Sequence, residues 1–488
     1  MTTRLKPSIW SRVIIHTHRW LGICGGVVFL MWFASGIVMM YARMPRLAPE
    51  ERLMRLPVLD LSTAQVAPAE AAKQSSLFPE RLRVGMLGDR PVYRFTHGTK
   101  RTTVFADNAK PLRGLPRDEA IGLVRRLVPE HASTTRYDAY LTDADQWTLQ
   151  ARAFLPMHRI ALGDSEGTYL YLSDLTGESV METTRSGRRW AYFGPVLHWV
   201  YFTPFRRHTK LWNHSLIWLS IAGCLLTFSG LVWGIWSYSP KGRYRLGGVR
   251  SHSPFAGLIR WHHYAGLIFG FTTFTWILSG CLSLDPWSWH PSTLPTRQQR
   301  EAVAGGTLQL NQLTTSRLRE GVSAIASSFA PKELEVVQFQ GEPFLVAYHV
   351  SSSDQVEESA NTDRSVLVPP VLSTDHRLVS ALAPEEGAFR KFDDSVVLAA
   401  ARAAMSETTV LEAVFLQDYD TYYYDRNGVL PLPVLRVRYD DPPRTWLYLD
   451  PQRGVIVHKE ERLSRINRWL YHGLHNLDFP FLYHRRPL

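Results

Sequence analysis

HRWLGICGGVVFLMWFASG, residues 18–36, has a second version later in the chain, HHYAGLIFGFTTFTWILSG, residues 262–280. The two stretches align without gaps at a constant offset of 244 residues (262 minus 18). The identical positions are His18 with His262, Gly22 with Gly266, Gly26 with Gly270, Trp32 with Trp276, Ser35 with Ser279 and Gly36 with Gly280. Shared hydrophobicity alone does not select the same His, Gly and Trp positions, so the sequence predicts an internal duplication.

A second repeat, at an offset of 277 residues (432 minus 155), extends this duplication into the polar parts of the chain. It pairs Leu155-Pro156 with Leu432-Pro433, Tyr171-Leu172 with Tyr448-Leu449, Gly177 with Gly454, Arg188 with Arg465 and Leu197-His198 with Leu474-His475. LHWVYFTPFRRH (197–208) leads into an apolar stretch, whereas its counterpart LHNLDFPFLYHRRPL (474–488) does not. We therefore expect a fourth membrane helix to be missing, through truncation or because another chain supplies it.

Three stretches contain no Asp, Glu, Lys or Arg, namely residues 20–42, 215–237 and 264–284. Each is long enough to supply the ~20 residues that an α-helix needs to cross a membrane, and so predicts a membrane-spanning helix. The loop 238–259 has no acidic residue and four basic ones, Lys241, Arg243, Arg245 and Arg250. Because short basic loops stay in the cytoplasm, we expect a multi-pass protein of the bacterial inner membrane with a cytoplasmic N-terminus and large periplasmic domains.

The formal net charge of +11 raises the question of a nucleic-acid partner. No long basic run and no nucleic-acid motif occurs, so we expect membrane lipid, and not nucleic acid, as a partner. The cysteines, Cys24, Cys224 and Cys281, all fall in apolar stretches without a CxxC spacing. We therefore expect no disulfide framework and no zinc site, and interpret the cysteines as helix-packing residues.

The predicted fold class is an α-helical membrane bundle, with three spans present and a fourth missing, plus two α+β extracytoplasmic domains. Alternating apolar residues around glycine turns predict hairpins at 84–97 and 333–350. Helical spacing predicts helices at 117–128 and 394–405. The expected segments are a cytoplasmic N-terminus (1–12), helix 1 (13–42), domain 1 (43–190), a pre-helix segment with helix 2 (191–238), a basic cytoplasmic loop (239–256), helix 3 (257–285), domain 2 (286–470) and a second pre-helix segment (471–488).

Histidines begin two of the predicted membrane helices. His18 and His262 start the first and third spans, and each is followed by glycines four and eight residues later, at 22 and 26 or at 266 and 270. Positions i, i+4 and i+8 share one side of a helix, so a porphyrin could lie along that side. Haem iron accepts two neutral histidines on facing helices as axial ligands.

We therefore expect His18 and His262 to bind the iron of one haem b, against Gly22, Gly26, Gly266 and Gly270. His198 and His475 are the candidates for a second haem near the outer face. The alternative is that the glycines only mediate helix packing and the histidines are solvated. Neighbouring histidines compete for the same roles, namely His16, His263, His208, His214, His472 and His484.

The start of the first span, His-x-Trp-x-Gly (18–22), resembles that of the PepSY-associated transmembrane family. The matching stretch WHHYAGL (261–267) at the start of the third span and Leu197-His198 ahead of the second span extend the resemblance to nearly the whole chain. The resemblance implies a four-helix membrane unit, PepSY-like soluble domains and two b-type haems, as in the ferric-siderophore reductases of that family. Other members are iron-uptake-associated inner-membrane proteins.

These features predict a transmembrane electron conduit. It would take electrons from a cytoplasmic or membrane donor, pass them between two haems and reduce a ferric siderophore or another ferric chelate in the periplasm. On this hypothesis the chain is a ferric-chelate reductase of iron uptake. The alternative is a non-enzymatic, membrane-anchored PepSY binding or regulatory module that acts on an envelope partner. A transporter is disfavoured, because no charged residue lies inside any span.

Overall fold

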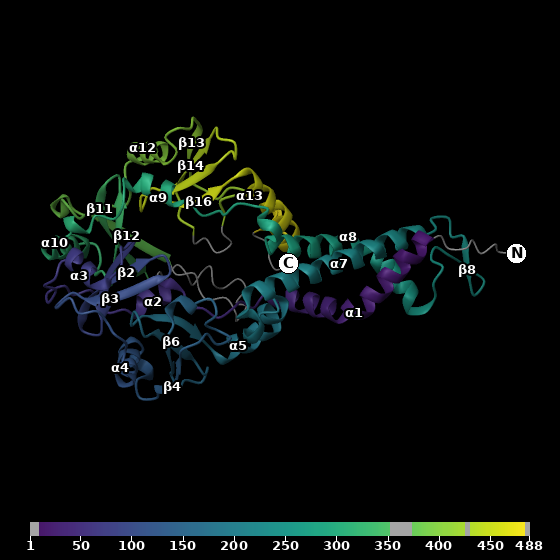
Figure 1. Ribbon diagram of the computed structural model, residues 1–488, viewed down its shortest axis with the longest axis horizontal. Coiled ribbons are helices and arrows are strands. Elements are labelled where there is room, and N and C mark those ends of the chain that lie inside the picture. Colours follow the sequence, from purple (N-terminus) through teal and green to yellow (C-terminus); the bar gives the residue numbers. More distant parts are fainter. Residues whose placement is uncertain (1–8, 352–372, 425–429, 484–488) are drawn as a thin grey trace. The chain divides into compact units, whose positions relative to one another are not determined.

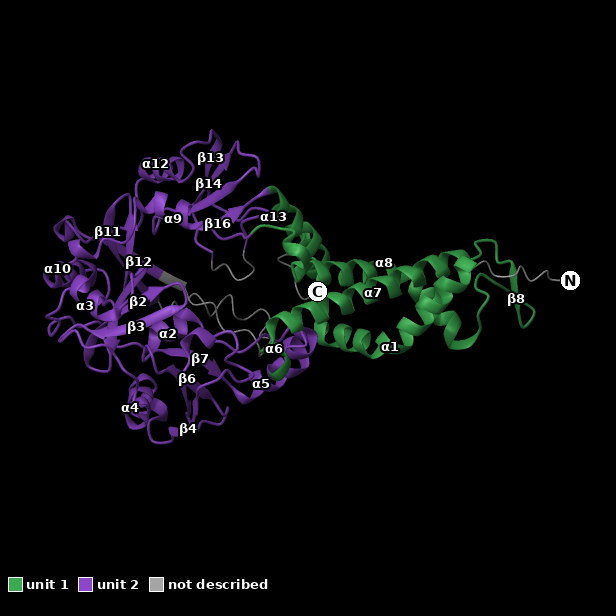
Figure 2. Cartoon of the chain, viewed as in Figure 1, with its two compact units in different colours: residues 1–37, 204–291, 462–488 green, residues 38–203, 292–461 purple. Residues whose placement is uncertain are grey.

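The computed structural model describes residues 9–351, 373–424 and 430–483 (Figure 1). The chain forms two compact units, each assembled from segments that are distant in sequence (Figure 2). Unit 1 comprises residues 1–37, 204–291 and 462–488. Unit 2 comprises residues 38–203 and 292–461. Unit 1 is mainly helical, whereas unit 2 contains the larger β-sheets with helices packed on them.

Among the described residues, three helices of unit 1 are long and apolar enough to cross a membrane, α1 Ile9–Met39, α7 Thr209–Ser237 and α8 Gly257–Ser283. They agree with the predicted spans but begin earlier. In α1 the helix starts 11 residues before the charge-free stretch (20 minus 9), because helical bonding continues through polar residues such as Arg12. Between α7 and α8, a Cβ on Gly223 would lie 3.1 Å from Ile277, which is the close small-residue packing expected in lipid.

Shorter elements complete unit 1. They are β8 Tyr244–Leu246, β9 Val249–Ser251, η4 Pro286–Ser288, α13 Arg462–Asn467, the π-helical η7 Arg468–Gly473, α14 Leu474–Asn476 and α15 Pro480–Tyr483. The β8–β9 hairpin is tied to the end of α7, because the Tyr244 hydroxyl donates to the Ser237 carbonyl at 3.0 Å. His252 donates through Nδ1 to the Ser239 carbonyl at 2.8 Å. The basic loop predicted from the sequence is therefore a folded hairpin.

The central sheet formed by the described residues of unit 2 has six antiparallel strands in the order β12-β11-β10-β1-β2-β3. Their bounds are β1 Arg81–Leu87, β2 Arg90–His97, β3 Lys100–Phe105, β10 Leu334–Phe339, β11 Glu342–Ser351 and β12 Ser373–Ser380. The hairpins predicted at 84–97 and 333–350 are confirmed as β1–β2 and β10–β11. They join into one sheet because β1 pairs with β10, residues 82–84 lying opposite 334–336. Helices α3 Pro68–Ser75 and α10 Thr315–Ala326 bury apolar residues of this sheet.

Two further sheets in the same described part of the chain share one strand order, β4-β5-β6-β7 and β13-β14-β15-β16. Their bounds are β4 Arg136–Leu141, β5 Met157–Ala161, β6 Tyr169–Ser173, β7 Ser179–Thr183, β13 Val410–Leu416, β14 Val434–Tyr439, β15 Trp446–Asp450 and β16 Val455–Glu460. Gly177 and Gly454 turn the last hairpin of each sheet with the same φ of +65°, which glycine adopts without strain. A short α-helix and a π-helix follow each sheet, first α5 Arg185–Ala191 with η3 Tyr192–Val196, then α13 with η7.

The two helices predicted in the polar segments are confirmed as α4 Arg117–Leu127 and α12 Asp394–Ala404. Each packs its apolar side on one four-stranded sheet, α4 against β5 and β6 and α12 against β14 and β15. The remaining short helices are α2 Pro49–Arg55, η1 Pro129–His131, η2 Arg152–Phe154, α6 Thr203–Arg206, α9 Arg297–Ala304, η5 Leu310–Gln312 and η6 Pro384–Glu386.

Candidate functional site

His18 lies on α1 and its imidazole reaches the backbone of α7. Its Nδ1 is 2.9 Å from the carbonyl oxygen of Leu226. A carbonyl only accepts, so Nδ1 carries the proton and Nε2 of the neutral ring keeps its lone pair. The ring fits because residue 230 is glycine, where a Cβ would lie 2.4 Å from Cε1 of His18. Helix α7 therefore sets both the tautomer and the position of this imidazole, as outer partners of metal-binding histidines do.

His262 lies on α8 beside His18. The centroids of the two imidazole rings are 6.0 Å apart, with their planes tilted by 41°. Among the residues that the structure describes, the ring of His262 has no hydrogen-bond partner, so its nitrogens are available to a ligand. An imidazole nitrogen binds a metal such as zinc at about 2.0–2.1 Å, so a metal ion between two facing rings places their centroids roughly 6 Å apart. At this separation His18 and His262 would both be able to hold one haem iron, which would supply one-electron chemistry.

The adjacent His263 has a different role. It is buried, and both ring nitrogens have partners: Nδ1 is 2.8 Å from the Ser253 hydroxyl and Nε2 is 2.8 Å from the Gly234 carbonyl. Because the carbonyl must accept from Nε2, Nδ1 of the neutral ring accepts from the hydroxyl. His263 thus links the segment after β9 to α7. Of the two neighbouring histidines, His262 is the one that can bind a metal without breaking these bonds.

His475 lies on α14 and its ring contacts α8. Its Nδ1 is 3.0 Å from the carbonyl oxygen of Trp276 and 3.1 Å from the hydroxyl of Ser279. A Cβ on Gly280 would lie 3.3 Å from Cε1 of the ring. The surroundings repeat those of His18. In both cases Nδ1 bonds a helix carbonyl and the ring lies against the glycine four residues later in that helix. Burial lowers the pKa of His475 although the Trp276 carbonyl opposes it, and this favours the neutral imidazole that metal binding requires.

His198 was predicted as the second ligand beside His475. The structure places His198 in unit 2, two residues after the end of η3, and His475 in unit 1. The two residues follow π-helical segments of the same kind, which is the local counterpart of their match in the sequence. Their pairing around one haem stays a prediction.

The other histidines that compete for these roles have varied surroundings. His16 and His208 are exposed. His214 bonds a carbonyl of its own helix through Nδ1 at 2.7 Å, and His472 lies 3.9 Å from a carboxylate oxygen of Asp478. His484 lies outside the described residues.

The four glycines predicted to lie along the haem also differ in their surroundings. A Cβ on Gly26 or Gly266 would meet no heavy atom within 4 Å outside its own helix backbone, so both positions are open. At Gly22 the nearest side chain of α7 would be 3.7 Å away, which is ordinary contact. A Cβ on Gly270 would lie 2.7 Å from a leucine of α7, so close helix packing accounts for this glycine.

Sequence reasoning missed a cluster of charges in unit 2. Arg52 and Arg83 bond the carboxylate of Glu333 at 2.7 and 3.0 Å, and Arg83 also bonds Glu178 at 2.8 Å. Burial raises the pKa of Glu333, but the facing guanidinium groups outweigh it and lower the pKa to about 2. In the sequence these residues are indistinguishable from solvated surface charges, since no local pattern marks which charges share one interior.

The structure thus brings His18 and His262 together in unit 1 and gives His475 an equivalent backbone acceptor. It separates His262 from His263 by the hydrogen bonds that each makes. No protein-family model, curated protein or solved structure matches the chain.

Proposed function

We propose that the chain is a haem-binding electron conduit of the inner membrane that reduces a ferric siderophore or another ferric chelate on the periplasmic side. The observation that carries the proposal is the 6.0 Å separation between the rings of His18 and His262, which come from two different apolar helices. Haem iron, when bound, supplies the one-electron change between its ferric and ferrous states. The chain's own part is to hold the two imidazoles, fix the tautomer of His18 through the Leu226 carbonyl and set the spacing of the rings.

The contrast with His263 supports this proposal. His263 stabilises helix packing with both ring nitrogens, which bond Ser253 and Gly234. Within the described part of the chain, His18 uses Nδ1 alone, which leaves Nε2 for a metal. Ionisable residues at membrane depth are costly unless they serve a function, and here two face one another.

The proposal includes a duplicated architecture. The four-stranded sheets of unit 2 share their strand order, and Gly177 and Gly454 occupy the same turn with the same φ. A π-helix follows each sheet and ends two residues before His198 in the first half and two residues before His475 in the second. These likenesses match the repeats in the sequence and support a pseudo-symmetric arrangement of haem ligands.

The absorption spectrum of the full chain, purified in detergent, oxidised and then reduced with dithionite, tests the proposal. We expect a haem Soret band whose intensity per protein falls in His18→Ala and in His262→Ala. His16→Ala is the matched control, because His16 is exposed two residues away on the same helix, and it should leave the band unchanged. A protein without a Soret band, or a band that neither substitution affects, would contradict the proposal and favour a membrane-anchored binding or regulatory module.

A further inference from the structure

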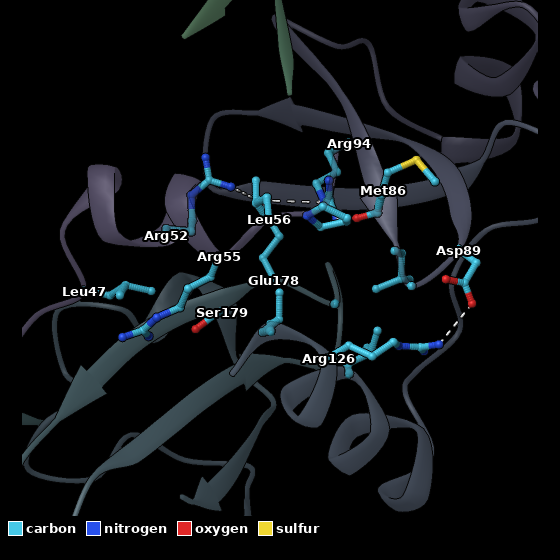
Figure 3. A pocket seen from close by; sticks show the side chains of 16 residues that line it. Leu47, Arg52, Arg55, Leu56, Met86, Asp89, Arg94, Arg126, Glu178 and Ser179 are labelled. Carbon is cyan, nitrogen blue, oxygen red and sulfur yellow. Dashed lines mark hydrogen bonds and ion pairs between the residues drawn. The ribbon is translucent and has the colours of Figure 1, made fainter. Parts of the chain in front are cut away.

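A cavity in unit 2 is lined by helix α2, the β1–β2 hairpin, helix α4 and the β6–β7 turn (Figure 3). Its volume is about 150 Å³, at least about ten times the roughly 10–15 Å³ that one water molecule needs. The charged residues that line it, among those described, are Arg52, Arg55, Arg94, Arg126, Asp89 and Glu178. Guanidinium groups outnumber carboxylates around this hollow, which favours a negatively charged occupant.

The acidic groups nearby do not balance the buried positive charge. Glu178 already pairs with Arg83 at 2.8 Å and with Arg52 at 3.5 Å. Glu333 is shared by the same two arginines. Together with Arg94, three guanidinium groups therefore share two carboxylates, and one positive charge is left over.

Arg94 carries this surplus charge. Its side chain is 5% exposed, and the nearest carboxylate oxygen, on Glu178, is 3.8 Å away. Its hydrogen bonds go to neutral carbonyl oxygens, of Met86 at 3.0 Å and of Thr176 at 3.4 Å. Gly85 makes room for the side chain, since a Cβ there would lie 2.8 Å from Nη1. Burial lowers the pKa of Arg94, and an anion in the cavity would stabilise its charged form.

Two more arginines bring donors to the cavity. Arg126 lies over Gly88, where a Cβ would be 2.9 Å from its Nη2, and it bonds Asp89 through Nη1 at 3.1 Å. Arg55 bonds Glu182, also through Nη1. A guanidinium has five N–H donors, so one carboxylate contact leaves others for a ligand.

The rest of the lining is largely apolar, with side chains from Leu56, Met86, Leu87, Leu123 and Leu127. An inorganic anion would gain nothing from these side chains, whereas a carboxylate attached to a short hydrocarbon would use both kinds of surface. We propose that this cavity binds a small monocarboxylate, with its carboxylate among the guanidinium groups and its alkyl body on the leucines. The site is independent of the histidine pair in unit 1.

Titration of the full chain in detergent with sodium butyrate, followed by calorimetry and by thermal unfolding, tests this site. We expect butyrate to bind and to raise Tm, and affinity to increase roughly fourfold for each methylene from acetate to butyrate. Butyramide, which has nearly the same shape without the charge, should not bind. Arg126→Gln should weaken butyrate binding about tenfold. Arg125→Gln, on the preceding residue of α4, which is also exposed, should leave it unchanged.

Arg55→Gln provides a second variant at the cavity, and it should weaken binding as Arg126→Gln does. Both side chains are partly exposed, at 27% and 53%, so their loss leaves the interior of unit 2 intact. Equal effects of butyrate and butyramide, tighter binding of inorganic phosphate than of butyrate, or no binding of any probe would overturn the proposal.

Discussion

Glycine at position 230 allows an imidazole from α1 to reach the backbone of α7. A helix carbonyl that already accepts hydrogen bonds from its own helix is still open to an outside imidazole when residue i+4 has no side chain. Both carbonyls used here also accept from a serine hydroxyl at i+3, Ser229 at 3.0 Å and Ser279 at 2.9 Å. Leu226 and Gly230 provide this arrangement for His18, and Trp276 and Gly280 provide it for His475. The clearance is smaller at Gly230, where a Cβ would lie 2.4 Å from the ring, against 3.3 Å at Gly280.

Gly230→Ala should therefore displace the ring of His18 from the Leu226 carbonyl. If the proposed haem site is correct, we expect the variant to retain less haem, measured as Soret absorbance per protein. Gly25→Ala is the matched control, because a Cβ there would meet its nearest neighbour at 3.8 Å, which is ordinary contact. A haem content in Gly230→Ala equal to that of the unmodified protein would show that this glycine does not position the ligand.

The duplicated motif in the sequence pairs His18 with His262, whose rings the structure places 6.0 Å apart, but it does not describe their surroundings. Leu226 contributes a backbone carbonyl, a group that every residue has and no sequence pattern marks. The adjacent His263 competes for the same role in the sequence, and its two hydrogen bonds distinguish it from His262. The arginine cavity was missed for a related reason, since burial of a charge depends on distant segments.

At the scale of elements, periodicity predicts hairpins and helices but not their partners. The β1–β2 and β10–β11 hairpins follow from alternation and glycine turns, which act over a few residues. The pairing of β1 with β10 depends on residues that are 250 positions apart, such as Arg83 and Glu333. Nothing local specifies which of several exposed strand edges meet, so this join could only be seen in the structure.

The charges at this join make unit 2 sensitive to acid. Although burial opposes it, Arg83 and Arg52 lower the pKa of Glu333 from 4.5 to about 2. A carboxyl with a lowered pKa stabilises the fold fully above its unfolded-state pKa and loses that contribution as pH falls through its folded-state pKa. We therefore expect the free energy of unfolding to fall between pH 4.5 and 2. Glu333→Gln should lower it by about 3–5 kcal/mol at pH 7 and flatten this pH dependence.

Urea unfolding of the full chain at several pH values measures both effects. Glu335→Gln is the control two residues further along the chain, since the Arg81 side chain that pairs with Glu335 is 65% exposed. Loss of that pair should cost at most about 1 kcal/mol. If both variants lose the same stability, the buried cluster has no special role in joining β1 to β10.

At the scale of the whole molecule, the central sheet constrains how the chain crosses the membrane. Strands β1 and β10 pair in one sheet, yet α7 and α8 lie between them in the sequence. Two crossings return a chain to the side that it left, so the shared sheet supports a path in which both helices span. The proposed topology therefore predicts that both segments of unit 2 are on one side of the membrane and that the loop between α7 and α8 is on the other.

Cysteine labelling tests this path in a background whose native cysteines are replaced by serine. Single cysteines at Lys100, Arg402 and Arg245 occupy exposed positions on β3, α12 and β8. In intact spheroplasts, a membrane-impermeant maleimide should label Lys100→Cys and Arg402→Cys, whereas Arg245→Cys should react only after permeabilisation. Labelling of the first two positions from opposite sides would rule out the path.

The pairing of β1 with β10 also sets an order of events during biosynthesis. When β1, β2 and β3 have been made, the edge of β1 stays open until β10 follows, because their paired residues are about 250 positions apart. The unpaired backbone groups of an open strand edge can pair with another nascent chain, and charged side chains on the strand make this aggregation less favourable. Arg81 and Arg83 stand on that strand and later acquire Glu335 and Glu333 as partners. The arginines that hold the finished sheet together would thus protect the unfinished one from aggregation.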